Sequence, residues 1–255
     1  SAEMLMMAPF PETRFVEAAL ELVRRNRRFV PPPGKGTFYL RPMEHATEKR
    51  LGLAPCRQFT VTMYGSPVGP YFPGAKREGL RLKVLDQGRV APGGTGAAKA
   101  MGNYAGAIPI AARWKKQGFN DVLFLDAAGK HHVTETSGSN SFVVLRSGMI
   151  VTPPLDDQIL PGITRDSTIR IARELLGLTV EERDLPLEEV LQDGEEFFCT
   201  GTAWTIQNVR EIVAGDTPHV FPQTRTRDAL FELLNGIQTG RREDPFGWVR
   251  KVSES

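Results

Sequence analysis

The chain has 255 residues, 40% of them hydrophobic, and its 32 basic and 30 acidic residues give a net charge of +2. This composition suits one large or two smaller globular domains, and the balanced charge excludes the strongly basic surface typical of nucleic-acid-binding proteins. No apolar run approaches the roughly 18 residues of a membrane span. The two cysteines, Cys56 and Cys199, lack the spacing of a metal site or a disulfide framework. We therefore expect a soluble, cytoplasmic protein without a metal site.

The first part of the chain predicts one helix and two strands. Apolar side chains at helical spacing between residues 12 and 28, with arginines in the last turn, indicate an amphipathic helix. Alternation then predicts strands at residues 37–41 and 58–64. Residues 65–79 hold three prolines and four glycines, which indicates a loop that serves as a hinge between domains. We expect this loop to end a small N-terminal domain, residues 1–79, and a larger domain to follow, residues 80–255.

The larger domain mixes short strands and helices without strict alternation, which favours an α+β fold over a doubly wound parallel sheet. Thr164 or Asp166 has the side-chain oxygen needed to cap a helix that stops near Gly177. Two further helices are expected at 105–117 and 226–238, and a helical turn is expected from Leu187. The expected strands cover 80–85, 121–126, 131–135, 141–146, 149–152, 179–184, 196–200 and 205–213.

The stretch from Gly93 to Tyr104 sets a single lysine, Lys99, among four glycines and three alanines. Small residues let the backbone approach a ligand closely. The stretch lacks both the ending of a P-loop and the glycine spacing of a dinucleotide fingerprint, so nucleotide binding is not indicated. A lysine that forms an imine with an aldehyde needs a fixed stem, room for a flat ring and desolvation. The alternative is a solvated surface lysine.

Three other segments are glycine-rich or hydroxyl-rich turns that follow apolar strands. They cover residues 134–140, 160–165 and 200–203, and the first of them contains Glu135. Main-chain N–H groups at the start of a helix, as at Ile163 and Thr164, are a ready anion site. Each turn alone is more often structural. Together they indicate a phosphate site beside a lysine and a carboxylate.

Four motifs make the sequence recognisable: GGTGAAKAMGNYAG around Lys99, TPPL at 152–155, ILPGITRDS at 159–167 and CTGTA at 199–203. In this order they resemble the branched-chain aminotransferases among the fold type IV pyridoxal phosphate enzymes. The resemblance implies a two-domain α+β fold, pyridoxal 5'-phosphate as cofactor and a homodimer. It also implies amino-group transfer from leucine, isoleucine or valine to 2-oxoglutarate by a ping-pong mechanism.

The resemblance also implies residue roles. Lys99 would bind the cofactor covalently and act as the general base, and Glu135 would hydrogen-bond the pyridine nitrogen. Tyr104 would border the ring, and the phosphate ligands would be Ile163, Thr164 and Thr202. The substrate-facing residues would be Tyr39, Arg41, Tyr71, Thr202 and Ala203. For Arg41, a partner of the distal carboxylate of glutamate, an interdomain salt bridge is the alternative role.

The sequence also departs from the family pattern. Met101, Trp204 and the pair Gln207-Asn208 replace residues that are usually different in the family. The family's N-terminal region, which carries a phosphate-binding arginine, has no counterpart before Ser1, so we expect a truncated N-terminal domain. Two further functions stay open: another type IV enzyme, such as a D-amino acid aminotransferase or aminodeoxychorismate lyase, and an inactive fragment with a binding or structural role.

Overall fold

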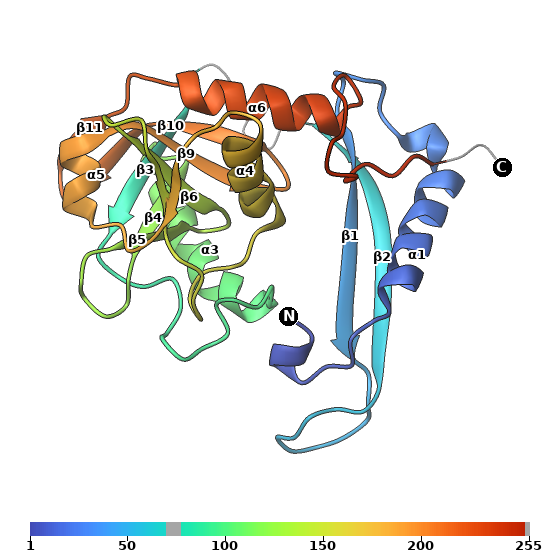
Figure 1. Cartoon of the computed structure of the whole chain (residues 1–255). Helices are drawn as coiled ribbons and strands as arrows, with labels where there is room; N and C mark the ends of the chain where they lie inside the picture. Colours follow the sequence, from blue (N-terminus) through green and yellow to red (C-terminus); the bar gives the residue numbers. More distant parts are fainter. Residues whose placement is uncertain (70–77, 253–255) are drawn as a thin grey trace. The chain divides into compact units, whose positions relative to one another are not determined.

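The computed structural model describes residues 1–69 and 78–252, and the chain divides into two compact units (Figure 1). One unit comprises Ser1–Tyr71 with Gly247–Ser255, and the other comprises Phe72–Phe246. The domains expected from the sequence, 1–79 and 80–255, leave the C-terminal residues out of the first unit. Local sequence patterns do not encode such a grouping, because it depends on contacts between residues far apart in the chain.

The first unit combines helix α1 (Glu12–Arg25) with an antiparallel pair, β1 (Thr37–Ala46) and β2 (Phe59–Val68). Two short 3-10 turns, η1 (Glu3–Leu5) and η2 (Arg27–Phe29), flank the helix. Both strands are longer than expected, and β2 runs into the loop expected at 65–79. Strand pairing explains the difference. The two strands pair along their whole length, from Thr37 opposite Val68, and these main-chain hydrogen bonds extend the strands into residues with low strand propensity.

The second unit is built on a nine-stranded sheet. Its strands are β3 (Leu80–Leu85), β4 (Asp121–Leu125), β5 (Val133–Thr136), β6 (Asn140–Leu145), β7 (Ile150–Thr152), β8 (Val180–Glu182), β9 (Gly194–Gly201), β10 (Thr205–Ala214) and β11 (Thr217–Val220). The sequence did not predict β11. Its Pro218 lowers strand propensity, and the strand forms at the sheet edge by pairing with β10.

The sheet closes on itself. β10 pairs with β3 on one side and β9 on the other, and β6 pairs with both β5 and β9. Because β3, β4 and β5 are paired in succession, these strands form a ring of pairings. A single apolar cluster draws buried side chains from every strand of the ring, among them Leu82, Leu123, Val133, Val143, Phe197 and Val209. The ring is therefore filled by packed side chains, as in other small barrels.

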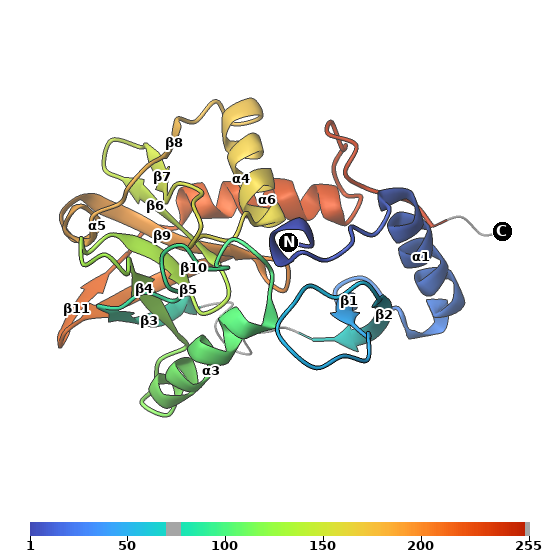
Figure 2. The same ribbon diagram turned by 90° about the horizontal axis from the view of Figure 1, so that it is seen from below.

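Four helices of the described second unit cover this sheet: α3 (Met101–Lys115), α4 (Ile163–Glu174), α5 (Leu187–Asp193) and α6 (Arg225–Gln238). Helix α3 packs Ala107 and Ala111 against Val122 and Phe124 of β4. Helices α4 and α6 contact each other and β9, away from α3 (Figure 2). This arrangement leaves the loop before α3 and the start of α4 to frame the candidate site.

Two sequence-based boundaries next to the candidate site are wrong. Helix α3 begins at Met101 rather than residue 105, so the end of the glycine-rich stretch is already helical. Helix α4 is capped by Gly162, and neither Thr164 nor Asp166 is the cap residue, since both lie inside the first turn. The prediction relied on residues whose side chains can accept a hydrogen bond from the helix start. The helix instead begins at Ile163, before either of these side chains.

The predicted α+β class is confirmed. Most strand pairs are antiparallel, while β3 pairs in parallel with both β4 and β10. Within residues 1–69 and 78–252, no helix combines the length and apolar character needed to cross a bilayer.

The start of α6 yields a stability prediction. Buried Glu196 accepts hydrogen bonds from the main-chain N–H groups of Thr226 at 2.8 Å and Arg227 at 2.9 Å. Glu196→Ala removes both acceptors, so we expect the free energy of unfolding in urea to fall by about 1–3 kcal/mol. Glu195→Ala, at the exposed neighbouring position, is the control and should change it by less than about 0.5 kcal/mol. Equal effects of the two substitutions would contradict the capping role.

Candidate active site

The loop that carries Lys99 is fixed by a side chain from the helix that follows it. Asn103, buried in the first turn of α3, donates from Nδ2 to the carbonyl oxygens of Thr95 at 2.6 Å and Ala98 at 2.9 Å. The Thr95 hydroxyl in turn donates to Asn103 Oδ1 at 3.0 Å. The backbone immediately before Lys99 is therefore held in one conformation, as a covalent attachment point requires.

The same loop packs closely on residues 157 and 158. The Ala97 N–H donates to the Asp157 carbonyl oxygen at 3.0 Å, and the Gly93 N–H donates to the Asp157 carboxylate. A Cβ atom at Gly96 would lie 2.7 Å from both the Asp157 carbonyl oxygen and Gln158 Cα. Only glycine permits this approach, which explains one of the small residues in the stretch.

Lys99 itself is exposed, and its ammonium group interacts with Tyr104. Lys99 Nζ donates to the Tyr104 hydroxyl at 3.0 Å and lies 5.3 Å from the centroid of the same ring. The desolvated surroundings expected for an imine-forming lysine are not seen around this side chain in the structure. The contact does join the two residues that were expected to bind and border the cofactor.

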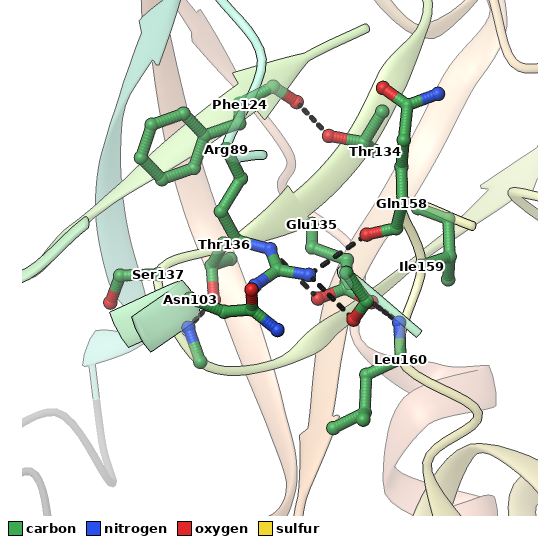
Figure 3. A network of polar contacts seen from close by, with 12 residues as sticks. Arg89, Asn103, Phe124, Thr134, Glu135, Thr136, Ser137, Gln158, Ile159 and Leu160 are labelled. Carbon is green, nitrogen blue, oxygen red and sulfur yellow. Dashed lines mark hydrogen bonds and ion pairs between the residues drawn. The ribbon is translucent and has the colours of Figure 1, made fainter. Parts of the chain in front are cut away.

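Glu135 is the buried carboxyl group of the site, with only 3% of its surface exposed. Its Oε1 accepts from the Leu160 N–H at 2.5 Å and from Asn140 Nδ2 at 3.0 Å, and its Oε2 lies 3.3 Å from Arg89 Nε (Figure 3). Burial raises the pKa of Glu135 to about 7, against the opposing effects of Arg89 and the Leu160 N–H. A second cation beside this group would lower its pKa and favour the charged form.

The chain runs directly from Glu135's partner Leu160 to the start of α4. Asn140 Nδ2 also donates to the Leu160 carbonyl oxygen at 2.8 Å, and a Cβ atom at Gly162 would collide with Asn140 Oδ1. No side chain caps α4, since Gly162 is its cap residue. The first-turn N–H groups at Ile163 and Thr164 can therefore face an anion.

A strained turn follows β9. The register pairs Asn140 with Thr200, so the exposed residues Thr202 and Ala203 come just beyond the strand partner of Asn140. Thr205, a β-branched residue, has a φ of 64°. Such left-handed backbone in a β-branched residue is a genuine outlier, and strain of this kind concentrates at functional sites.

The structure thus links Glu135 to the Lys99 loop through Arg89, and to the segment before α4 through Leu160. Tyr39 and Arg41 belong to β1 of the first unit, where Arg41 Cζ lies 5.0 Å from the Tyr39 ring centroid. Tyr71 lies outside the described residues. The roles of all these residues stay predictions.

Sequence reasoning missed three side chains that hold the site together: Arg89, Asn103 and Asn140. Arg89 stands alone in a loop after β3 and forms part of no recognised motif. Asn103 and Asn140 lie inside segments that the sequence singled out, but nothing local shows which main-chain groups they reach. An asparagine near the end of a glycine-containing turn is the one signal that could have raised interest, because its side-chain amide can both donate to and accept from main-chain groups.

The donor set fits pyridoxal phosphate. It offers an amine on a fixed loop, a buried carboxylate for a protonated ring nitrogen, and an uncapped helix start for a phosphate. The comparison with known families decides the assignment: residues 1–212 match the model of amino-transferase class IV. The chain belongs to the class IV aminotransferase family.

Relatives within the family are similar over nearly the whole chain. A mitochondrial branched-chain amino acid aminotransferase 1 of Humulus lupulus is 42% identical over 254 residues, which make up 97% of this chain and 63% of that protein. A methionine aminotransferase of Arabidopsis thaliana is 40% identical over 249 residues, 96% of this chain and 69% of that protein. The chain therefore spans less than two thirds of the Humulus protein.

A solved structure extends the likeness to three dimensions. The branched-chain aminotransferase of the thermophilic archaeon Thermoproteus uzoniensis, solved with norvaline, is 30% identical and superposes with a TM-score of 0.84. The alignment covers 99% of this class IV chain and 80% of that chain. The predicted fold type IV architecture is confirmed.

The raised pKa of Glu135 gives a pH prediction for the cofactor-free protein. Between its unfolded value of 4.5 and about 7, the folded state retains a proton that the unfolded state has lost. Stability should therefore fall as pH rises through this window, by on the order of 3 kcal/mol. Urea unfolding of wild type and Glu135→Gln from pH 4 to 8 measures it. The variant should lack this fall, and parallel curves would contradict the assignment.

Proposed function

We propose that this chain is the cofactor-binding part of a pyridoxal 5'-phosphate-dependent aminotransferase that transfers the amino group of leucine, isoleucine or valine to 2-oxoglutarate. One observation carries the proposal: the buried Glu135 carboxylate is hydrogen-bonded to Leu160, ahead of the α4 start, and ion-paired to an arginine that contacts the Lys99 loop. This connected set supports the proposal, because it joins a carboxylate, an uncapped helix start and the loop of a lysine in a class IV chain.

Each residue of the set has a distinct task. Glu135 would hold a proton on the ring nitrogen, and the N–H groups of Ile163 and Thr164, with Thr202, would hold the phosphate. Bound pyridoxal phosphate supplies an aldehyde for covalent attachment and a ring that accepts the electron pair left on the substrate Cα. Lys99 would bind that aldehyde and, when released, move the Cα proton as general base.

Tyr104 would place the amine of Lys99. Its hydroxyl accepts a hydrogen bond from Lys99 Nζ at 3.0 Å, so the amine is directed before any substrate arrives. The contact also limits the rotamers of a long, flexible side chain, which reduces the entropy lost in reaching a reactive geometry.

For the substrate we propose Thr202 and Ala203 as donors to the α-carboxylate, and Tyr39, Arg41 and Tyr71 as side chains that face it. These roles rest on the family resemblance. The stacking of Arg41 on Tyr39 supports the proposal in one respect, because a stacked guanidinium keeps its edge free for a bidentate carboxylate contact.

We also propose a homodimer. The support is the family resemblance, together with Leu51 and Leu53, which are fully exposed in the loop between β1 and β2. Light scattering with size-exclusion chromatography measures the mass in solution. Cytoplasmic localisation stays a prediction, since the names of similar proteins include a mitochondrial one.

Covalent trapping tests the role of Lys99. The full-length protein with pyridoxal phosphate should show an absorbance band at the violet edge of the visible range that borohydride removes, with the reduced cofactor attached to Lys99 in the digest. Lys99→Ala should lack the band and lose at least about 10²–10⁴-fold in rate. Lys116→Ala, in an exposed lysine after α3, should retain both. A wild-type protein without the band would refute the proposed function.

Amino-donor profiling tests the substrate class. With 2-oxoglutarate as acceptor, we expect the ratio kcat/KM for leucine, isoleucine and valine to exceed that for D-alanine and for methionine. The methionine aminotransferase among the relatives makes methionine the second candidate donor. A higher value for methionine would replace the branched-chain assignment, and a higher value for D-alanine would move the protein to the D-amino acid branch of type IV enzymes.

A further inference from the structure

Arg89, which follows β3, contacts three separate segments with one guanidinium group. Its Nε lies 3.3 Å from Glu135 Oε2, and its Nη2 donates to the carbonyl oxygens of Gln158 at 2.8 Å and Gly96 at 3.3 Å. Only 5% of the side chain is exposed. Figure 3 shows the guanidinium group between Glu135 and Gln158. A buried charge in this position is part of the site's interior.

The contact with Gly96 matters because this residue lies in the loop that ends at Lys99. Asn103 fixes the shape of that loop from its own helix, and Asp157 holds it from a neighbouring segment. Arg89 contacts both the loop and Glu135. The close packing of Gly96 on Gln158 means that the loop cannot shift toward this segment to restore a lost contact.

Charge gives Arg89 a second task. The charged groups that act on Glu135 are Arg89, Arg165 and Asp156, and the attraction of Arg89 is the largest of the three. Burial favours the neutral form of a carboxyl group, and a neutral form cannot hold a proton on a ring nitrogen by charge. Removing the nearest cation would therefore weaken the interaction that Glu135 is proposed to supply.

We propose that Arg89 is a positioning residue that ties the Lys99 loop to Glu135 and keeps the Glu135 carboxylate charged toward the cofactor's ring nitrogen. The inference rests on the proposed function. Arg89 touches neither the cofactor nor the substrate in this role and acts through Glu135 and the Gly96 carbonyl.

Two substitutions separate the two tasks. Arg89→Lys keeps a positive charge but loses the planar guanidinium group, which contacts Glu135 through Nε and two carbonyl oxygens through Nη2. Arg89→Met removes both the charge and the planar group while keeping a long side chain. Arg227→Lys is the matched control: Arg227 also bonds a main-chain oxygen, that of Ile206, and a carboxylate, that of Asp228.

The experiment uses the full-length protein stripped of cofactor and then titrated with pyridoxal phosphate. We expect affinity to fall about tenfold in Arg89→Lys and about a hundredfold in Arg89→Met. We also expect the midpoint of the pH titration of the cofactor's absorbance to move by about one pH unit or more in Arg89→Met, with little change in Arg89→Lys. Arg227→Lys should match wild type in both measurements.

The outcomes separate this inference from the proposed function. Wild-type affinity and titration in both Arg89 variants would overturn the inference while leaving the proposed function intact. Absence of cofactor binding by the wild-type protein would overturn both. If Arg89→Met does not fold, Arg89→Lys decides through affinity: an unchanged value overturns the positioning role, and a tenfold loss in a protein of wild-type melting temperature supports it.

Discussion

The structure depends on one constraint: a carboxyl group buried in the sheet needs hydrogen-bond and ion-pair partners from several segments of the chain. Glu135 accepts from Leu160 and Asn140 and pairs with Arg89. Leaving such a group without partners would cost several kcal/mol, so the segments that carry the partners are held around it. The Lys99 loop and the start of α4 thereby acquire fixed positions relative to the same side chain.

The closed sheet makes this burial possible. A ring of paired strands with an apolar filling gives β5 and β6 rigid places, and the carboxylate and Asn140 come from these adjacent strands. Glu135 in β5 and the start of α4 thus lie on regular elements, whereas Lys99 lies in a loop that Asn103 fixes.

Glycine serves close approach rather than flexibility at two points of the site. Gly96 lets the Lys99 loop lie against Gln158, and Gly162 lets α4 begin against Asn140. A methyl group at Gly162 would collide with Asn140, a hydrogen-bond partner of Glu135. A methyl group at Gly96 would collide with the backbone of residues 157 and 158, where Arg89 also binds. Packing around Glu135 therefore accounts for Gly96, one of the small residues that first drew attention to the sequence, and for Gly162.

The sequence by itself determined the α+β class, most element positions, and Lys99, Glu135 and the turn at 162–164 as candidates, because local periodicity and motif order carry that information. Only the tertiary structure decided that Arg89, Asn103 and Asn140 hold the site together and that the strands close into a ring. It also decided that Gly162, rather than Thr164 or Asp166, caps α4. These features depend on contacts between residues distant in the chain, which no local pattern encodes.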